Sequence, residues 1–266
     1  MTESTQTTEK AKPNTQFNNI GEQGLSSEYD YEKRFKKISE REFRSDTSEN
    51  DRYWEDYGKF RTHYKGIKML KDCKSLQVTY QLMYEIQPGT VFELGTYKGA
   101  FTLWMADQLD LLNGKDKKTE IFSLEKFEEL VDPLAKKDER IKYIFDDVTN
   151  LSAHLTPEIM EKLPHPWIIC EDCHFNLKGT LDFFNKYMKP GDYLFIEDLS
   201  NVSPDQTSYN PYKKNQNKVW DGSVKRKELF EWVKEREDEI LVDAYYCDFY
   251  GYNGTVQWDG IMKKIK

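Results

Sequence analysis

The chain has 266 residues and a formal net charge of −8 at pH 7, and 32% of its residues are charged. This acidic balance argues against a nucleic acid partner, because phosphate-binding surfaces need clustered Lys and Arg. The sequence contains no apolar run of membrane-spanning length, and its four cysteines are irregularly spaced. That cysteine usage fits a reducing cytoplasm better than a disulfide framework. We therefore expect a cytoplasmic protein that engages neither membrane nor nucleic acid.

The composition changes along the chain and suggests three parts. Residues 1–27 are polar without an apolar run, which predicts a disordered tail. Residues 28–65 carry aromatic residues at helical spacing and are predicted to form a helical extension. It could pack on the core as amphipathic helices, or serve as a lid or dimer arm. Residues 66–266 suffice for one enzyme domain. Within residues 28–65, the aromatic and apolar residues at helical spacing are Tyr31, Phe35, Ile38, Tyr53, Trp54, Tyr57 and Phe60.

An apolar strand predicted at residues 91–94 runs into the pattern Glu-x-Gly-x-x-x-Gly, from Glu93 through Gly95 to Gly99. Gly95 would let the backbone turn sharply, Gly99 would let it approach a ligand, and a helix at residues 100–112 would aim its free N–H groups at that ligand. The dinucleotide fingerprint does not fit, because Tyr97 stands where it needs a glycine. The loop looks like that of an S-adenosylmethionine (SAM) methyltransferase, although such a junction is also ordinary α/β architecture.

Four further strands are predicted at residues 120–124, 141–145, 167–170 and 192–196, and each ends at acidic residues. The carboxyl ends of parallel strands lie at one edge of an open sheet, where ligands bind. Glu125 could there accept the hydroxyls of a ribose. An acid after a strand can also cap the next helix. Adjacent acids, however, repel one another unless a cation lies between them. The pairs are Asp146-Asp147, Glu171-Asp172 and Glu197-Asp198.

A divalent metal is the simplest cation to propose. Asp172, Glu197 and Asp198 would supply hard oxygen ligands from two neighbouring strand ends, a set that suits Mg²⁺. Zinc or a redox pair at Cys170 and Cys173 is a weaker interpretation, because no second Cys or His pair has matching spacing. His174 is a candidate general base for an acceptor hydroxyl. It could instead orient a ligand or cap a helix.

Beyond the fifth strand, residues 200–222 form a polar insert that is too long for a simple connection. Its position after the acidic pair makes a substrate lid plausible. A helix is predicted at residues 224–237. Strands predicted at residues 241–246 and 255–262 would close the sheet as an antiparallel pair.

Three segments carry a resemblance to a known family: residues 93–99, Glu-Leu-Gly-Thr-Tyr-Lys-Gly; residues 169–174, Ile-Cys-Glu-Asp-Cys-His; and residues 191–198, Gly-Asp-Tyr-Leu-Phe-Ile-Glu-Asp. They resemble the cephalosporin-hydroxylase-type family of SAM methyltransferases. That family includes Mg²⁺-dependent sugar O-methyltransferases of macrolide biosynthesis and rhamnosyl O-methyltransferases. The similarity covers residues 64–200. It implies a Rossmann-like SAM methyltransferase fold, a mostly parallel doubly wound sheet with a C-terminal antiparallel strand pair, and a homo-oligomer.

We expect a Mg²⁺-dependent SAM O-methyltransferase that acts on a hydroxyl of a small specialised metabolite, a sugar or a polyketide-derived ring. A C- or N-methyltransferase and a non-catalytic, partner-binding protein of the same fold are the alternatives. The predicted catalytic residues are Asp172 and His174. The predicted metal ligands are Asp172, Glu197 and Asp198. The predicted cofactor-binding residues are Glu93, Gly95, Thr96, Tyr97, Gly99, Glu125 and Asp147.

Overall fold

The computed structural model describes residues 34–114, 118–200 and 222–266, of which residues 35–266 belong to one compact unit. The tail predicted at residues 1–27 and nearly all of the insert predicted at residues 200–222 lie outside the described residues. Among the described helices, none combines the length and the apolar character that a membrane span needs.

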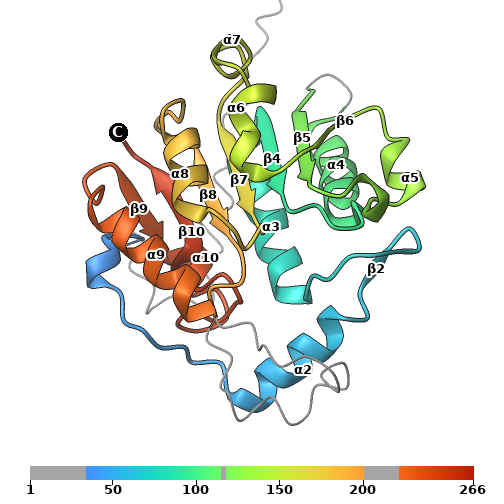
Figure 1. Ribbon diagram of the computed structural model, residues 1–266. Helices are drawn as coiled ribbons and strands as arrows, with labels where there is room; N and C mark the ends of the chain where they lie inside the picture. Colours follow the sequence, from blue (N-terminus) through green and yellow to red (C-terminus); the bar gives the residue numbers. More distant parts are fainter. Residues whose placement is uncertain (1–33, 115–117, 201–221) are drawn as a thin grey trace, which may run out of the picture. The chain divides into compact units, whose positions relative to one another are not determined.

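A mostly parallel sheet organises this unit (Figure 1). In the described chain its eight strands run in the order β1-β9-β10-β8-β7-β4-β5-β6, and a separate hairpin pairs β2 with β3. The strands β4 to β8 are parallel, and β10 lies antiparallel between β8 and β9. The strands are β1 Phe35–Lys36, β2 His63–Tyr64, β3 Ile67–Lys68, β4 Thr90–Leu94, β5 Glu120–Glu125, β6 Ile141–Phe145, β7 Trp167–Glu171, β8 Tyr193–Ile196, β9 Ile240–Asp243 and β10 Ile261–Lys264.

Helices surround the sheet, with α3 packed next to α4 and α8 next to α9. The α-helices are α2 Glu49–Lys59, α3 Cys73–Ile86, α4 Ala100–Asn113, α5 Pro133–Lys136, α6 Leu151–His154, α7 Pro157–Met160, α8 Leu177–Asn185, α9 Gly222–Lys234 and α10 Ala244–Cys247. The 3₁₀ turns are η3 Ile38–Glu40, η4 Glu128–Leu130, η5 Val148–Asn150 and η8 Trp258–Gly260.

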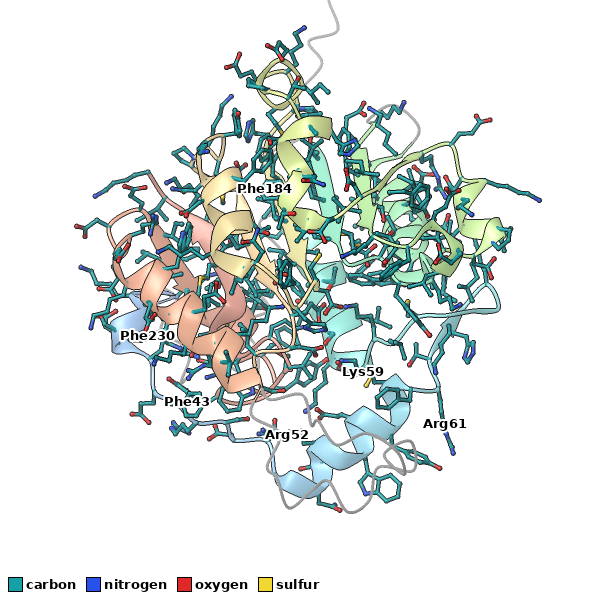
Figure 2. All side chains as sticks on the ribbon, viewed as in Figure 1. Phe43, Arg52, Lys59, Arg61, Phe184 and Phe230 are labelled. Carbon is teal, nitrogen blue, oxygen red and sulfur yellow. The ribbon has the colours of Figure 1, made fainter. Side chains whose placement is uncertain are left out.

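The central strands are covered on both faces, which explains their continuous apolar sequences. Every residue of β4 and β7 is buried, as expected for parallel strands with helices on both sides. Phe92 on β4 packs against Phe122, Trp167 and Phe184, with ring centroids 4.9 to 5.4 Å apart. Phe184 comes from α8 (labelled in Figure 2), so this aromatic cluster joins a helix to three strands.

The five parallel strands and the helix after the first of them are confirmed, but the closing pair differs in extent. β9 ends at Asp243, where α10 begins, and β10 begins only at Ile261. Residues 255–260 form turns, including η8, instead of a strand, and within them Gln257 Nε2 donates to Glu197 Oε2 at 3.0 Å. The predicted antiparallel pairing of the two strands is confirmed.

The extension is only partly helical. Phe35 lies in β1, paired with β9 at the sheet edge, and Ile38 lies in a 3₁₀ turn, so the first predicted helix is wrong from residue 35 onward. The reason is tertiary: Arg41 forms ion pairs of 2.6 Å with Asp248 and 2.7 Å with Asp259, which hold this segment against the C-terminal part of the chain. The later part of the extension is helical as expected, because residues 49–59 form α2.

Candidate functional site

A cavity of about 570 Å³ lies at the carboxyl ends of the parallel strands. Each of the five strands β4 to β8 contributes a residue at or just beyond its end: Gly95, Glu125, Asp147, Asp172 and Asp198. The predicted convergence of strand-end acids on one edge of the sheet is thus seen in the structure. The other lining residues are Lys59, Phe60, Leu70, Tyr97, Leu124, Lys126, Phe127, Val148, Cys173, His174 and Phe175.

Unusual backbone conformations gather at this cavity. Nine non-glycine residues of the described chain have positive φ angles, and four of them, all between 55° and 58°, line it: Leu70, Tyr97, His174 and Asp198. A left-handed conformation costs such residues about 1–2 kcal/mol each. Strained residues that cluster at a cavity indicate a functional site, since packing elsewhere must maintain them.

One half of the cavity is formed by the glycine loop and β5. Tyr97 donates its backbone N–H to Glu125 Oε2 at 2.8 Å, and Phe127 donates its own to Oε1 at 3.2 Å. These bonds fix the carboxylate of Glu125, of which each oxygen keeps further acceptor capacity. Asp147 lines the same half; a hydrogen bond from Lys126 at 2.8 Å, with others from Thr149, lowers its pKa to about 2.

Three of the predicted cofactor-binding residues do not line the cavity. Thr102 donates to Glu93, which is buried under α4, and burial raises the pKa of Glu93 to about 8 against the influence of Thr102 and Lys71. Thr96 donates to the carbonyl oxygen of Leu124 at 3.0 Å, so it ties the loop to β5. Gly99 is the residue just before α4, and a Cβ atom there would lie 2.8 Å from that of Ala135. These three residues therefore support the conformation of the glycine loop on the side away from the cavity.

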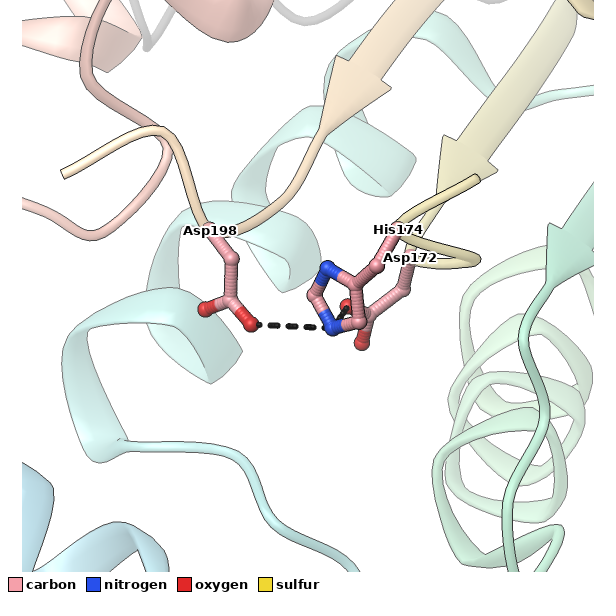
Figure 3. Close-up of side chains that lie close together, drawn as sticks. All are labelled: Asp172, His174 and Asp198. Atoms are coloured by element: carbon pink, nitrogen blue, oxygen red, sulfur yellow. Dashed lines mark ion pairs between the residues drawn. The ribbon is translucent and has the colours of Figure 1, made fainter. Parts of the chain in front are cut away.

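The other half of the cavity holds two of the three predicted metal ligands together with the predicted base (Figure 3). His174 Nε2 lies 3.4 Å from Asp172 Oδ1 and 3.4 Å from Asp198 Oδ2. One ligand atom from each of these side chains lies within 4.8 Å of the others. The ring of His174 is therefore placed between carboxylates that follow β7 and β8.

Two lysines, which the sequence did not single out, form ion pairs with the acids at this end of the sheet. Lys71 Nζ lies 2.8 Å from Asp172 Oδ2 and 3.0 Å from Glu197 Oε1, and its side chain is 5% exposed. Lys59 Nζ lies 3.0 Å from Asp198 Oδ1. Burial would lower the pKa of both lysines, but the neighbouring carboxylates outweigh it and raise both. The repulsion that favoured a metal is thus relieved by side chains of the protein itself.

Glu197, the third predicted metal ligand, lies behind the cavity wall. Its side chain is 1% exposed, and it contacts Lys71 through Oε1 and Gln257 through Oε2. Burial raises the pKa of Glu197 against the charge of Lys71. Asp198 shows the opposite shift: burial alone would raise its pKa, but Lys59 and His174 lower it.

Three buried carboxylate oxygens at the ends of β7 and β8 accept no hydrogen bond within the described chain: Glu171 Oε2, which is ion-paired with Lys225, Asp172 Oδ1 and Glu197 Oε1. The ionisable neighbours of the last two are Lys71 Nζ, 3.0 Å from Glu197 Oε1, and His174 Nε2, 3.4 Å from Asp172 Oδ1, and a carboxylate oxygen can accept further partners, an ion included. Asp172 Oδ1 and Glu197 Oε1 belong to predicted metal ligands, and Asp198 Oδ2 is directed at the same imidazole as Asp172 Oδ1. The hard oxygen donors present here therefore fit a divalent cation such as Mg²⁺.

Glu171 plays a different part from its neighbour Asp172. It is fully buried, forms a 2.7 Å ion pair with Lys225 of α9, and accepts the backbone N–H of Cys173 at 3.0 Å. Glu171 thereby holds the turn that presents Asp172 and His174. The structure does not support the alternative of a thiol metal site. Cys170 is buried in β7, and the group of possible metal ligands in the described chain contains no cysteine.

Lys59 and Lys71 were overlooked for different reasons. Lys59 lies in the last turn of α2, where a lysine ordinarily complements the helix dipole, so its position gave no signal. Lys71 lies just before the N-terminus of α3, where a positive charge is unfavourable, and directly after apolar residues. A lysine in this unfavourable position indicates that a nearby acid compensates its charge. Phe127 and Phe175, which are 50% and 61% exposed at the cavity, could not be recognised from the sequence.

Comparisons with known proteins give structural neighbours only. No protein-family model and no curated protein sequence matches the chain. An apo structure of CmcI superposes with a TM-score of 0.59 at 22% identity, over 85% of this chain and 88% of that chain. A structure of CmcI with Mg and SAM gives 0.58 at 20% identity, over 94% and 100%. A structure of CmcI with SAH gives 0.57 at 22%, over 85% and 96%. This likeness confirms the predicted Rossmann-like fold.

Proposed function

We propose that the chain is a SAM-dependent O-methyltransferase of the cephalosporin-hydroxylase type, and that it uses Mg²⁺ to methylate a hydroxyl of a small specialised metabolite. One observation carries the proposal: a single cavity joins a glycine loop with a ribose-type carboxylate to two half-buried aspartates around a histidine. The likeness to CmcI, which has been solved with Mg and SAM and with SAH, supports the same assignment.

The half of the cavity next to β4 and β5 would hold SAM. Glu125, fixed by two backbone N–H groups, would accept hydrogen bonds from the ribose hydroxyls. Gly95 lines the cavity at the turn after β4, and Phe127, Asp147 and Val148 provide an aromatic and polar border for a nucleoside. When bound, SAM supplies an electrophilic methyl group. The protein's part is to hold an acceptor oxygen in line with it, since positioning is the main source of rate in such transfers.

The half of the cavity next to β7 and β8 would hold the metal and the acceptor. Asp172, Asp198 and, behind them, Glu197 would bind Mg²⁺, which supplies positive charge that favours ionisation of a hydroxyl. His174, whose ring lies beside both aspartates, would take the acceptor's proton. Phe60 and Phe175 line the cavity alongside and would exclude water from a ring-shaped acceptor. A sugar or a polyketide-derived ring is the acceptor we propose.

The proposal is tested by incubating the purified protein with isotopically methyl-labelled SAM and a panel of hydroxylated acceptors, with Mg²⁺ or with excess EDTA. We expect Mg²⁺-dependent transfer of the label to a product oxygen, located by mass spectrometry and NMR. Label on carbon or nitrogen would favour the alternative methyltransferases. Failure of the protein to bind SAM in calorimetry would contradict the proposal altogether.

A further inference from the structure

The acidic cluster, defined as Asp172, Glu197 and Asp198, is held by ammonium groups that come from outside the parallel strands. Lys71 belongs to the segment between β3 and α3, and it bridges Asp172 and Glu197. Lys59 is the last residue of α2 and pairs with Asp198. Figure 2 labels Lys59 at the end of that helix. Three carboxylates and two ammonium groups leave the cluster with one net negative charge.

The lysines divide the carboxylate oxygens of the two aspartates into two sets. Lys71 contacts Oδ2 of Asp172, whereas Oδ1 of the same group is directed at His174. Lys59 contacts Oδ1 of Asp198, whereas Oδ2 is directed at His174. Each ammonium therefore holds one oxygen and leaves the opposite one facing His174. Glu197 differs, because the oxygen near Lys71 is also the one that accepts no hydrogen bond in the described chain.

A divalent cation that binds these acids must come close to both ammonium groups. Metal–oxygen distances for Mg²⁺ are about 2.0–2.1 Å. An ion bound to Asp172 Oδ1 or Glu197 Oε1 would therefore share that carboxylate group with the ammonium of Lys71. The side chain of Lys71 is 5% exposed and that of Glu197 is 1% exposed. Water therefore screens this repulsion poorly.

We propose that Lys71 and Lys59 are internal counter-ions of the acidic cluster, and that a divalent cation binds there only in competition with them. This proposal rests on the metal requirement in the proposed function and extends it by naming residues that set the affinity. Lys71 has the larger effect, because it contacts two of the three acids and is more deeply buried than Lys59, whose side chain is 17% exposed. The protein would then hold its acids in place without metal and bind the ion weakly and reversibly.

The test measures the affinity for Mn²⁺, a paramagnetic substitute for Mg²⁺, from the electron paramagnetic resonance signal of the free ion. We expect Lys71→Met to tighten Mn²⁺ binding by about tenfold or more, because a neighbouring positive charge is lost from a poorly solvated site. Lys59→Met should tighten it by a smaller factor, and Lys71→Arg, which keeps the charge, should stay close to the parent protein. If Lys71→Met fails to fold, the less buried Lys59→Met still tests the proposal.

The matched control is Lys264→Met. Lys264 is also buried, 7% exposed, and is ion-paired with Glu239 at 2.6 Å, but it lies near the start of β8, away from the cavity. This variant should leave Mn²⁺ affinity unchanged, and SAM affinity should be unchanged in all variants. Unchanged or weaker Mn²⁺ binding in Lys71→Met and Lys59→Met would overturn the proposal while leaving the metal site standing. Absence of Mn²⁺ binding in every variant, with SAM still bound, would instead overturn the metal requirement.

Discussion

A Cβ atom at Gly95 would lie 2.5 Å from the carbonyl oxygen of Asp172, so the backbone of the glycine loop is in contact with the backbone of the turn after β7. The contact continues the parallel pairing of β4 with β7, in which Asp172 donates its N–H to Leu94 at 2.8 Å. The two halves of the cavity are thus joined where a side chain cannot fit. Gly95 serves the placement of Asp172 as much as it serves a ligand.

The first prediction follows from this contact. Gly95→Ala should lower both stability and SAM affinity, because it combines an unfavourable φ of +93° with a backbone clash. Gly191→Ala is the matched control, since Gly191 has a φ of +103° but open space around it. Urea unfolding should show the larger loss for Gly95→Ala, by about 1 kcal/mol or more, whereas equal losses in the two variants would mean that the clash is relieved by backbone movement.

A second prediction concerns the acids that face the cavity. Asp172→Asn and Asp198→Asn should abolish methyl transfer yet leave SAM bound, because the proposed SAM contacts lie on β4 to β6. EDTA should likewise abolish methyl transfer by the parent protein, and added Mg²⁺ should restore the activity. The control is Asp146→Asn, since Asp146 pairs with His154 at 2.7 Å and does not line the cavity. Full activity in excess EDTA would exclude the metal mechanism.

A third prediction separates two roles for His174. If it takes the acceptor's proton, His174→Ala should lower kcat by about 10²–10⁴-fold with little change in the KM for SAM. The loss should shrink at high pH, where solvent hydroxide can remove the proton. If His174 only steadies Asp172 and Asp198, saturating Mg²⁺ should rescue the variant at every pH. Rates measured against Mg²⁺ concentration at two pH values decide between the roles.

A fourth prediction concerns Glu93. Burial raises its pKa from 4.5 to about 8, so the folded protein binds a proton more tightly there than the unfolded chain does. Its contribution to stability is therefore greatest below pH 4.5 and is lost as the pH rises to about 8. The loss is at most about 5 kcal/mol. Glu93→Gln has no charge to desolvate, so it should be at least as stable as the parent protein at pH 8.

Urea unfolding as a function of pH provides the measurement for Glu93. The parent protein should lose more stability than Glu93→Gln between pH 4.5 and about 8. Glu128→Gln is the control, because the side chain of Glu128 is 61% exposed and its removal should leave the slope unchanged. Parallel curves for the parent protein and Glu93→Gln would show that Glu93 ionises normally in the folded state.

The sequence by itself determined the parallel strands, their order along the chain and the edge of the sheet where a ligand would bind. Buried parallel strands need continuous apolar runs, and the acids that follow each run must lie at the same edge because the strands are parallel. The sequence therefore places Gly95, Glu125, Asp147, Asp172 and Asp198 at one edge of the sheet, and all five line the cavity. The strand-end position of a residue is a local property of the sequence.

Only the tertiary structure decided which charges face one another. Lys71 is 101 residues from Asp172, and Lys59 is 139 residues from Asp198. Among 39 Lys and Arg residues nothing in the sequence pairs these two with those acids. The structure likewise separated Glu197 from Asp198, because Gln257 and Lys71 hold Glu197 in the interior whereas Asp198, with a left-handed backbone, lines the cavity. Long-range ion pairs depend on how packing brings distant segments together, and a one-dimensional pattern does not record that.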